Sequence, residues 1–164
     1  MMDLAVVAEL ALLSVTLSVI TIVDFRTQTI PDVATALLAA GGLVFQAITS
    51  LETLQWAMAS GLLYFLLFWA IRQGHWRVTG RLGMGFGDVK LAGAAGVWLA
   101  PGLLPAFIGI AAFSALLSVS AVAIYAGAGA LSRRIPFGPF LALSLMVCWL
   151  LKMSNIGLEA FYAI

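Results

Sequence analysis

The stretch LAVVAELALLSVTLSVITIV, residues 4–23, decides the fold class of this chain. At a rise of ~1.5 Å per residue, a helix over this stretch crosses the ~30 Å hydrocarbon core of a bilayer. The whole chain has 164 residues, of which 63% are hydrophobic and 9% are charged. Soluble domains carry about 25% charged residues. We therefore expect an integral membrane protein with a single domain over residues 1–164.

Further hydrophobic runs follow the first one, so it is not merely a removable signal peptide. We predict an all-α, polytopic membrane protein with six transmembrane helices and short connections. The five later runs cover residues 33–50, 54–71, 89–100, 102 to about 131, and 137–151. The run at 89–100 is short and stops at Pro101, so its helix is the one least able to span a bilayer alone.

Basic residues indicate the orientation, because they collect in cytoplasmic connections. Seven of the eight Lys and Arg residues fall on one side of the predicted bundle: Arg26, Arg72, Arg77, Arg81, Lys90, Arg133 and Arg134. Lys152 falls on the other side. We expect the side with these seven basic residues to face the cytoplasm and both termini to face outward. The net charge of +1 gives no indication of a nucleic-acid partner.

Acidic residues at membrane depth tend to mark function. Three of the seven acids, Asp24, Asp32 and Asp88, fall on the predicted cytoplasmic side. Asp24 ends the first predicted helix and Asp88 opens the fourth, so distant helices could bring two carboxylates to one depth, within reach of water.

Each of these three aspartates also has a structural alternative. Asp88 is placed to act as a helix N-cap, and Asp32, directly after Pro31, to cap the second helix. Asp24 could be a solvated interfacial acid paired with Arg26.

Alternating glycines precede Asp88 in RLGMGFGDVK, residues 81–90. Gly83, Gly85 and Gly87 have no side chains, and they let an irregular or strand-like segment approach another backbone closely. A protease needs such a segment beside its catalytic acid, because its substrate must lie extended and within reach. The alternative is a flexible glycine-rich loop.

Three stretches together resemble one family. GFGD, residues 85–88, resembles the G-x-G-D motif of membrane aspartyl proteases, and GMGFGDVKLAGAAG, residues 83–96, resembles the corresponding stretch of the type IV prepilin peptidase family. DFRTQTIPD, residues 24–32, resembles the first aspartate motif of that family. IPFGPFLALS, residues 135–144, resembles its late Pro-Phe-Gly-Pro-Phe-Leu segment. The three stretches cover about a fifth of the chain, and their order also agrees.

The resemblance implies a membrane aspartic endopeptidase that removes leader peptides from type IV prepilins or pseudopilins. It implies cleavage on the cytoplasmic side of the inner, or cytoplasmic, membrane of a bacterium or archaeon, with products that enter pili or secretion machinery. Asp24 and Asp88 inherit the catalytic roles, and Asp32 inherits none. The other site-shaping or substrate-binding residues implied are Gly85, Gly87, Pro136 and Gly138.

The implied chemistry needs two carboxylates and neither a metal nor a cofactor. Like charges held close cannot both ionise cheaply, so the pair shares one proton. One carboxylate then activates a water while the other hydrogen-bonds the scissile carbonyl. The single Cys148 and single His75 rule out an internal disulfide, a multi-cysteine zinc site and a histidine-built metal centre.

One departure from the family pattern is informative. Larger members carry an extra N-terminal region, often with two cysteine pairs, and also methylate the new pilin N-terminus. Here the first cytoplasmic loop covers only about residues 24–32 and no cysteine pair exists. We therefore expect a short member without methyltransferase activity, such as those that serve tight-adherence (Flp-type) pili.

Two other classes stay open from the residues alone. A small transporter would bury its acids near the bilayer midplane, and a non-enzymatic subunit of a pilus or secretion assembly would need no acid pair.

A few remaining residues have structural interpretations. Lys90 is expected to extend its ammonium to the interface, and the alternative is that it biases the ionisation of the aspartate pair. His75 and Trp76 are expected to lie at the interface in the third connection. The spacing of Ala92 and Gly96 favours close helix packing.

Overall fold

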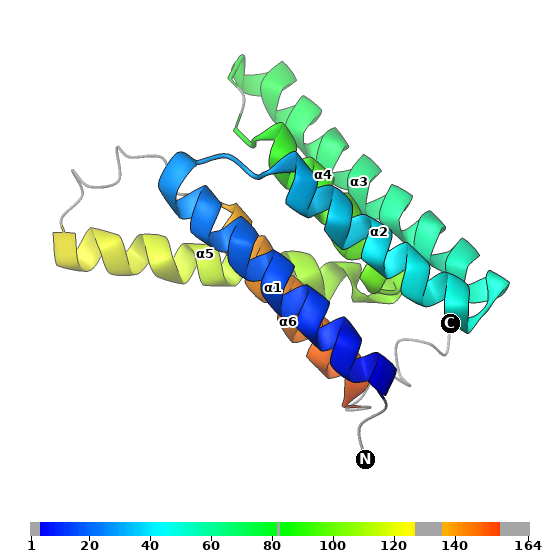
Figure 1. Ribbon diagram of the computed structural model, residues 1–164. Coiled ribbons are helices and arrows are strands. Elements are labelled where there is room, and N and C mark those ends of the chain that lie inside the picture. The colour runs from blue at the N-terminus through cyan, green and yellow to red at the C-terminus, as the bar shows by residue number, and fades with distance from the viewer. Residues whose placement is uncertain (1–3, 82, 127–135, 155–164) are drawn as a thin grey trace.

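The computed structural model describes residues 4–81, 83–126 and 136–154 of the chain (Figure 1). The elements are α1 (Leu4–Thr27), α2 (Asp32–Thr49), α3 (Leu51–Thr79), α4 (Phe86–Trp98), the 3-10 turn η1 (Pro101–Leu103), α5 (Leu104–Ala126) and α6 (Gly138–Met153). The described residues contain no strand. The predicted all-α fold with six helices is confirmed.

Four segments of the described chain are long and apolar enough to cross a membrane: Leu4–Thr27, Asp32–Thr49, Leu51–Thr79 and Pro101–Tyr125. The polytopic membrane class is therefore confirmed as well. α6 is a shorter apolar helix of 16 residues. α4 has only 13 residues, which at ~1.5 Å per residue fall well short of a ~30 Å hydrocarbon core.

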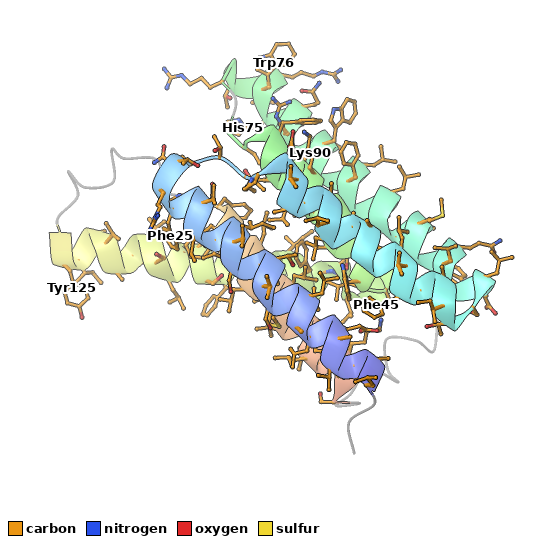
Figure 2. The ribbon with its side chains drawn as sticks, viewed as in Figure 1. Phe25, Phe45, His75, Trp76, Lys90 and Tyr125 are labelled. Atoms are coloured by element: carbon orange, nitrogen blue, oxygen red, sulfur yellow. The ribbon has the colours of Figure 1, made fainter. Side chains whose placement is uncertain are left out.

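The third helix is longer than the sequence prediction. It ends at Thr79 rather than near residue 71, because nothing before Gly80 breaks it. Gly80 adopts a left-handed conformation with φ of 67° and donates its N–H to the carbonyl of Trp76. His75 and Trp76 therefore lie on the last turns of α3 and not in a loop, and Figure 2 shows them at the same end of the molecule as Lys90.

The fifth helix begins later than predicted. Pro101 starts the short turn η1, and α5 follows from Leu104. In Figure 1, α5 runs at a steep angle to the antiparallel pair α1 and α6. The predicted end of this helix near residue 131, together with Arg133 and Arg134, lies outside the described residues.

Close packing of α4 on α3 fixes the centre of the fold. A Cβ on Gly96 would lie 2.7 Å from the backbone oxygen of Ser60, and one on Gly93 would lie 3.0 Å from Cβ of Phe65. Small residues at these positions let the two backbones approach. The packing role predicted for the Ala92–Gly96 face is confirmed, with Ala92 fully buried.

The C-terminal end of α4 is held by side chains of two neighbouring helices. Pro101 follows closely and disfavours further helix, so the carbonyls of Trp98 and Leu99 have no α-helical partner, and that of Ala100 accepts from the N–H of Leu103 at 3.0 Å in the turn η1. Each accepts a side-chain hydrogen bond: Lys152 Nζ donates to Trp98 O (3.2 Å), Ser60 Oγ to Leu99 O (2.7 Å) and Tyr64 OH to Ala100 O (3.3 Å). The short helix therefore ends inside the protein with these carbonyls satisfied.

Candidate active site

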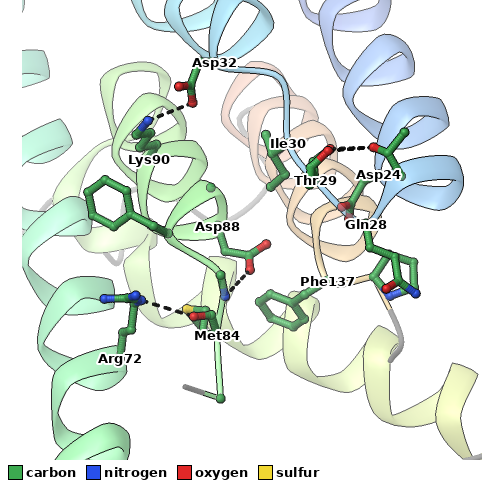
Figure 3. A pocket seen from close by; sticks show the side chains of 16 residues that line it. Asp24, Gln28, Thr29, Ile30, Asp32, Arg72, Met84, Asp88, Lys90 and Phe137 are labelled. Atoms are coloured by element: carbon green, nitrogen blue, oxygen red, sulfur yellow. Dashed lines mark hydrogen bonds and ion pairs between the residues drawn. The ribbon is translucent and has the colours of Figure 1, made fainter. Parts of the chain in front are cut away.

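One end of the bundle contains a pocket of about 1150 Å³. It lies between the end of α1, the α1–α2 connection, the glycine loop before α4 and the residues that open α6 (Figure 3). Among the described residues, five ionisable side chains line it: Asp24, Asp32, Arg72, Asp88 and Lys90. The pocket thus gathers all three aspartates that the sequence placed on one side.

Asp24 is fixed by a contact from the other end of the chain. Its side chain is 4% exposed, in the last turns of α1. The backbone N–H of Gly138, at the first position of α6, donates to Oδ2 of Asp24 at 2.9 Å. A Cβ at Gly138 would lie 2.6 Å from that same oxygen. A larger residue at position 138 would therefore force the carboxylate or the start of α6 to shift.

The end of α1 also turns the chain sharply toward α2. Gln28 adopts a positive φ of 54° and donates its N–H to the carbonyl of Asp24 at 2.9 Å. Among the residues that the structure describes, Asp24 makes no ion pair with Arg26 within 4 Å. Because Asp24 is also buried, the alternative of a solvated interfacial acid is wrong, with or without a pairing to Arg26.

Asp88 is the third residue of α4. The alternative that Asp88 is the N-cap of this helix is therefore wrong. The N-cap is Gly85, whose N–H donates to Oδ2 of Asp88 at 3.1 Å. Asp88 lies outside the four candidate membrane spans. Burial and, to a lesser degree, the charge of Asp24 raise the pKa of Asp88 to about 6, although the Gly85 N–H opposes the shift.

The two carboxyl groups enter the pocket from separate helices (Figure 3). Because the charge of Asp24 contributes to the raised pKa of Asp88, the two groups are close enough to interact electrostatically. Two interacting carboxyls can hold one shared proton, with one group ionised and the other neutral. Such a pair can activate a water and polarise a carbonyl without any other group.

The glycine loop packs against neighbouring segments on two sides. A Cβ on Gly83 would lie 2.7 Å from the ring of His75, and one on Gly87 would lie 3.0 Å from Cβ of Ile30. Gly87 is already within α4, so it does not belong to an extended segment. Of the predicted site-shaping residues, Gly85, Gly87 and Pro136 line the pocket.

Residues 11–150 match the family model described as the type IV leader peptidase family. The chain belongs to this family. Its similar relatives include proteins named "Prepilin leader peptidase/N-methyltransferase" from Escherichia coli (strain K12), Aeromonas hydrophila and Neisseria gonorrhoeae. They are 36%, 33% and 30% identical over 132, 140 and 136 residues, respectively.

These alignments cover 78%, 81% and 83% of this chain but 56%, 46% and 45% of the respective relatives. The chain therefore spans about half the length of the curated relatives it matches. No solved structure matches it.

In this member of the leader peptidase family, Asp32 is an ion-pair partner and not a helix cap. The N-cap of α2 is Pro31, and no side chain caps that end. Asp32 Oδ1 instead lies 2.8 Å from Nζ of Lys90 on α4. The ammonium of Lys90 also lies 5.2 Å from the centre of the Phe86 ring. The sequence left two interpretations of Lys90, an ammonium at the interface and an influence on the ionisation of the aspartate pair, and neither of them included the ion pair with Asp32.

Sequence reasoning also missed the position of Arg72 in the leader peptidase pocket. It was counted as a topological charge, but Nε donates to the carbonyl of Met84 in the glycine loop at 3.2 Å. Its guanidinium lies 5.7 Å from the centre of the Phe86 ring. No local pattern around Arg72 indicates these contacts, because they depend on how α3 packs against α4.

Proposed function

We propose that this protein is a membrane aspartic endopeptidase that removes leader peptides from type IV prepilins or pseudopilins. The observation that carries the proposal is the pocket that Asp24 and Asp88 share, in a member of the type IV leader peptidase family. The first predicted motif supplies Asp24 and the glycine motif supplies Asp88, and their charges interact.

In the proposed mechanism, the shared proton resides on Asp88, whose pKa, raised to about 6, lets it keep a proton to a higher pH than an ordinary aspartate does. Ionised Asp24 takes a proton from a water, whose oxygen bonds to the scissile carbonyl carbon. Asp88 donates its proton to the carbonyl oxygen in the tetrahedral intermediate. Collapse of the intermediate breaks the C–N bond, Asp24 passes its proton to the leaving amine, and Asp88 recovers its proton.

The proposed roles of the remaining site residues follow from their contacts. Gly138 and Gly85 hold the two carboxylates through backbone N–H groups at 2.9 and 3.1 Å. Gly87 lets Ile30 approach the start of α4. Pro136 forms part of the pocket wall just before α6. All four residues therefore shape the site without taking part in proton transfer.

We place the pocket on the cytoplasmic side of a bacterial or archaeal cytoplasmic membrane, with the N-terminus outside. Support comes from the basic residues near the pocket end, which include Arg26, Arg72 and Lys90, whereas Lys152 lies near the other end of α6. Cysteines placed at Gln28 and Glu52 test this orientation. An impermeant thiol reagent applied to intact cells should label Glu52→Cys and not Gln28→Cys. The reverse pattern would contradict it.

We further propose that the substrate is of the Flp, or tight-adherence, type and that this chain transfers no methyl group. The α1–α2 connection consists of residues 28–31, which leaves no room there for a cofactor-binding domain. Mass spectrometry of mature pilin made with this enzyme should find an unmodified N-terminal amine. An added methyl group that depends on this chain would contradict the proposal.

The decisive experiment is co-expression with a small prepilin, with the shortened product detected on a gel. The wild-type chain should produce the shortened pilin, and Asp24→Asn and Asp88→Asn should not. Glu52→Gln, in the first turn of α3, is the matched control and should cleave normally. Unprocessed prepilin with the wild-type enzyme would favour the transporter or assembly-subunit alternatives.

A further inference from the structure

A second charged pair lines the same pocket as the two candidate catalytic aspartates. Asp32 comes from the first turn of α2, and Lys90 from the first turns of α4 (Figure 3). Their charged atoms lie 2.8 Å apart, and the side chains are 72% and 36% exposed, respectively. An exposed ion pair of this kind contributes little to stability. Its position beside the aspartates is therefore of more interest than its strength.

The pair holds the Lys90 ammonium in one place. Lys90 is two residues beyond Asp88, so the two side chains leave α4 in different directions, and the ammonium approaches Asp88 only when the long stem of Lys90 bends back. Asp32 binds the ammonium, and the Phe86 ring lies 5.2 Å from it. Among the residues that the structure describes, no cation lies within 4 Å of the Asp88 carboxylate.

The other charges around Asp88 are also accounted for, element by element. α1 contributes Asp24 to the pocket, α2 contributes Asp32, and α3 contributes Arg72. Arg72 is bound to the carbonyl of Met84 at 3.2 Å. Within the described residues, the opening of α6 adds no ionisable side chain to the lining. Of the two cations among the described lining residues, Lys90 is therefore the one whose charge is balanced by Asp32.

We propose that Asp32 is a positioning residue that acts through Lys90. By binding and neutralising the ammonium, Asp32 keeps it from pairing with Asp88, so that the two catalytic carboxylates retain their shared proton at near-neutral pH. This inference rests on the proposed function. It gives Asp32 a role other than the helix cap and other than direct catalysis.

The expected effects have opposite signs for the two partners. Asp32→Asn leaves Lys90 as an unbalanced positive charge on a flexible stem, which favours ionised Asp88 and lowers its proton affinity. Because Asp88 must be protonated to act as the acid, the alkaline limb of the activity profile should move to lower pH. Lys90→Met leaves Asp32 as an unbalanced negative charge, so that limb should move to higher pH.

The test is the pH profile of kcat/KM for prepilin cleavage, measured for the purified enzyme in proteoliposomes. We expect shifts of a few tenths of a pH unit in opposite directions for Asp32→Asn and Lys90→Met. The double variant should return close to the wild-type midpoint, and Asp32→Glu, which keeps the charge, should also stay near it. Arg77→Gln, an exposed cation on α3 outside the pocket lining, is the control and should not shift the profile.

Several outcomes would overturn the inference while leaving the proposed function intact. Two single variants with unmoved midpoints and only lower protein abundance would indicate a purely structural ion pair. Changes in KM without any shift in the midpoint would indicate direct contact with the substrate. Two shifts of the same sign would exclude charge balance. Absence of cleavage by the wild-type enzyme would instead contradict the proposed function.

Discussion

The two ends of α4 differ in how their polar groups are satisfied. At the C-terminal end, the carbonyls of Trp98, Leu99 and Ala100 each accept a hydrogen bond from a neighbouring helix, and Ser60, one of the donors, is fully buried. At the N-terminal end, Gly85 is exposed and Asp88 faces a large pocket. One end is thus anchored and the other is open to a reactant. We therefore expect mutations at the C-terminal end to affect stability and mutations at the N-terminal end to affect reaction rate.

The largest effect should come from the carboxyl groups at the open end. Asp88→Asn and its partner Asp24→Asn should each lower cleavage by about 10²–10⁴-fold, because an amide can neither accept nor share the proton. Both proteins should still accumulate in the membrane, since neither change affects the packing of α3 on α4. Cleavage of co-expressed prepilin, normalised to enzyme abundance, is the measurement. Activity retained in either variant would mean that the catalytic pair is wrongly assigned.

A smaller loss of activity should follow Gly138→Ala. The new Cβ would lie 2.6 Å from Asp24 Oδ2, so the carboxylate or α6 must move. A displacement of ~1 Å at a reacting group can lower a rate about 10²-fold. Gly74→Ala is the matched control, because a Cβ at Gly74 in α3 meets nothing within 4 Å. Equal cleavage rates for the two alanine variants would show that the close approach at Gly138 does not position Asp24.

At the anchored end, Ser60→Ala should lower stability and leave cleavage per folded enzyme nearly unchanged. Ser60 is fully buried, and its loss leaves the carbonyl of Leu99 without its donor. A buried unsatisfied polar group costs about 1–3 kcal/mol. The free energy of unfolding in detergent is the measurement. Thr49→Ala, which removes an exposed hydroxyl bonded to its own helix, should change it far less. A large loss of kcat in Ser60→Ala would contradict the division between the two ends.

The smallest effect should appear in the pH dependence of stability. The pKa of Asp88 rises from 3.8 to about 6 on folding, so the folded protein binds this proton more tightly than the unfolded chain does. Binding of this proton stabilises the folded state fully at pH values below 3.8, the pKa in the unfolded chain. The stabilisation is lost as the pH rises through about 6, the pKa in the folded protein. The melting temperature of the wild type should therefore fall over this pH range by more than that of Asp88→Asn. Parallel curves for the two proteins would contradict the raised pKa.

The fold and the candidate pair could be predicted because they depend on local signals. Long apolar runs define the helices, and Asp24 and Asp88 lie within motifs at the ends of such runs. Loss of hydropathy near residue 71 was taken as the end of the third helix, although polar residues continue a helix equally well until Gly80 stops it. Loss of hydropathy therefore does not mark the end of this helix.

The partners of the polar side chains could not be predicted from local pattern. Asp32 and Lys90 are separated by 58 residues, and Pro31 directly before Asp32 favoured the simpler interpretation of a cap. Gly138 and Asp24 are 114 residues apart. These contacts arise when α1 packs on α6 and α2 packs on α4, and neither packing leaves a periodic signal around the residues concerned.

The length of α4 has a consequence for the surrounding lipid. Its 13 residues give it roughly 20 Å, so its two ends cannot both reach the surfaces of a bilayer. Because side chains from α3 and α6 supply donors to its C-terminal carbonyls, that end requires neither water nor headgroups. A change in membrane thickness then affects only the long helices, which can adapt by changing their tilt. We therefore expect the cleavage rate in vesicles to vary little with acyl-chain length, even where the tilt of α1 and α3 changes.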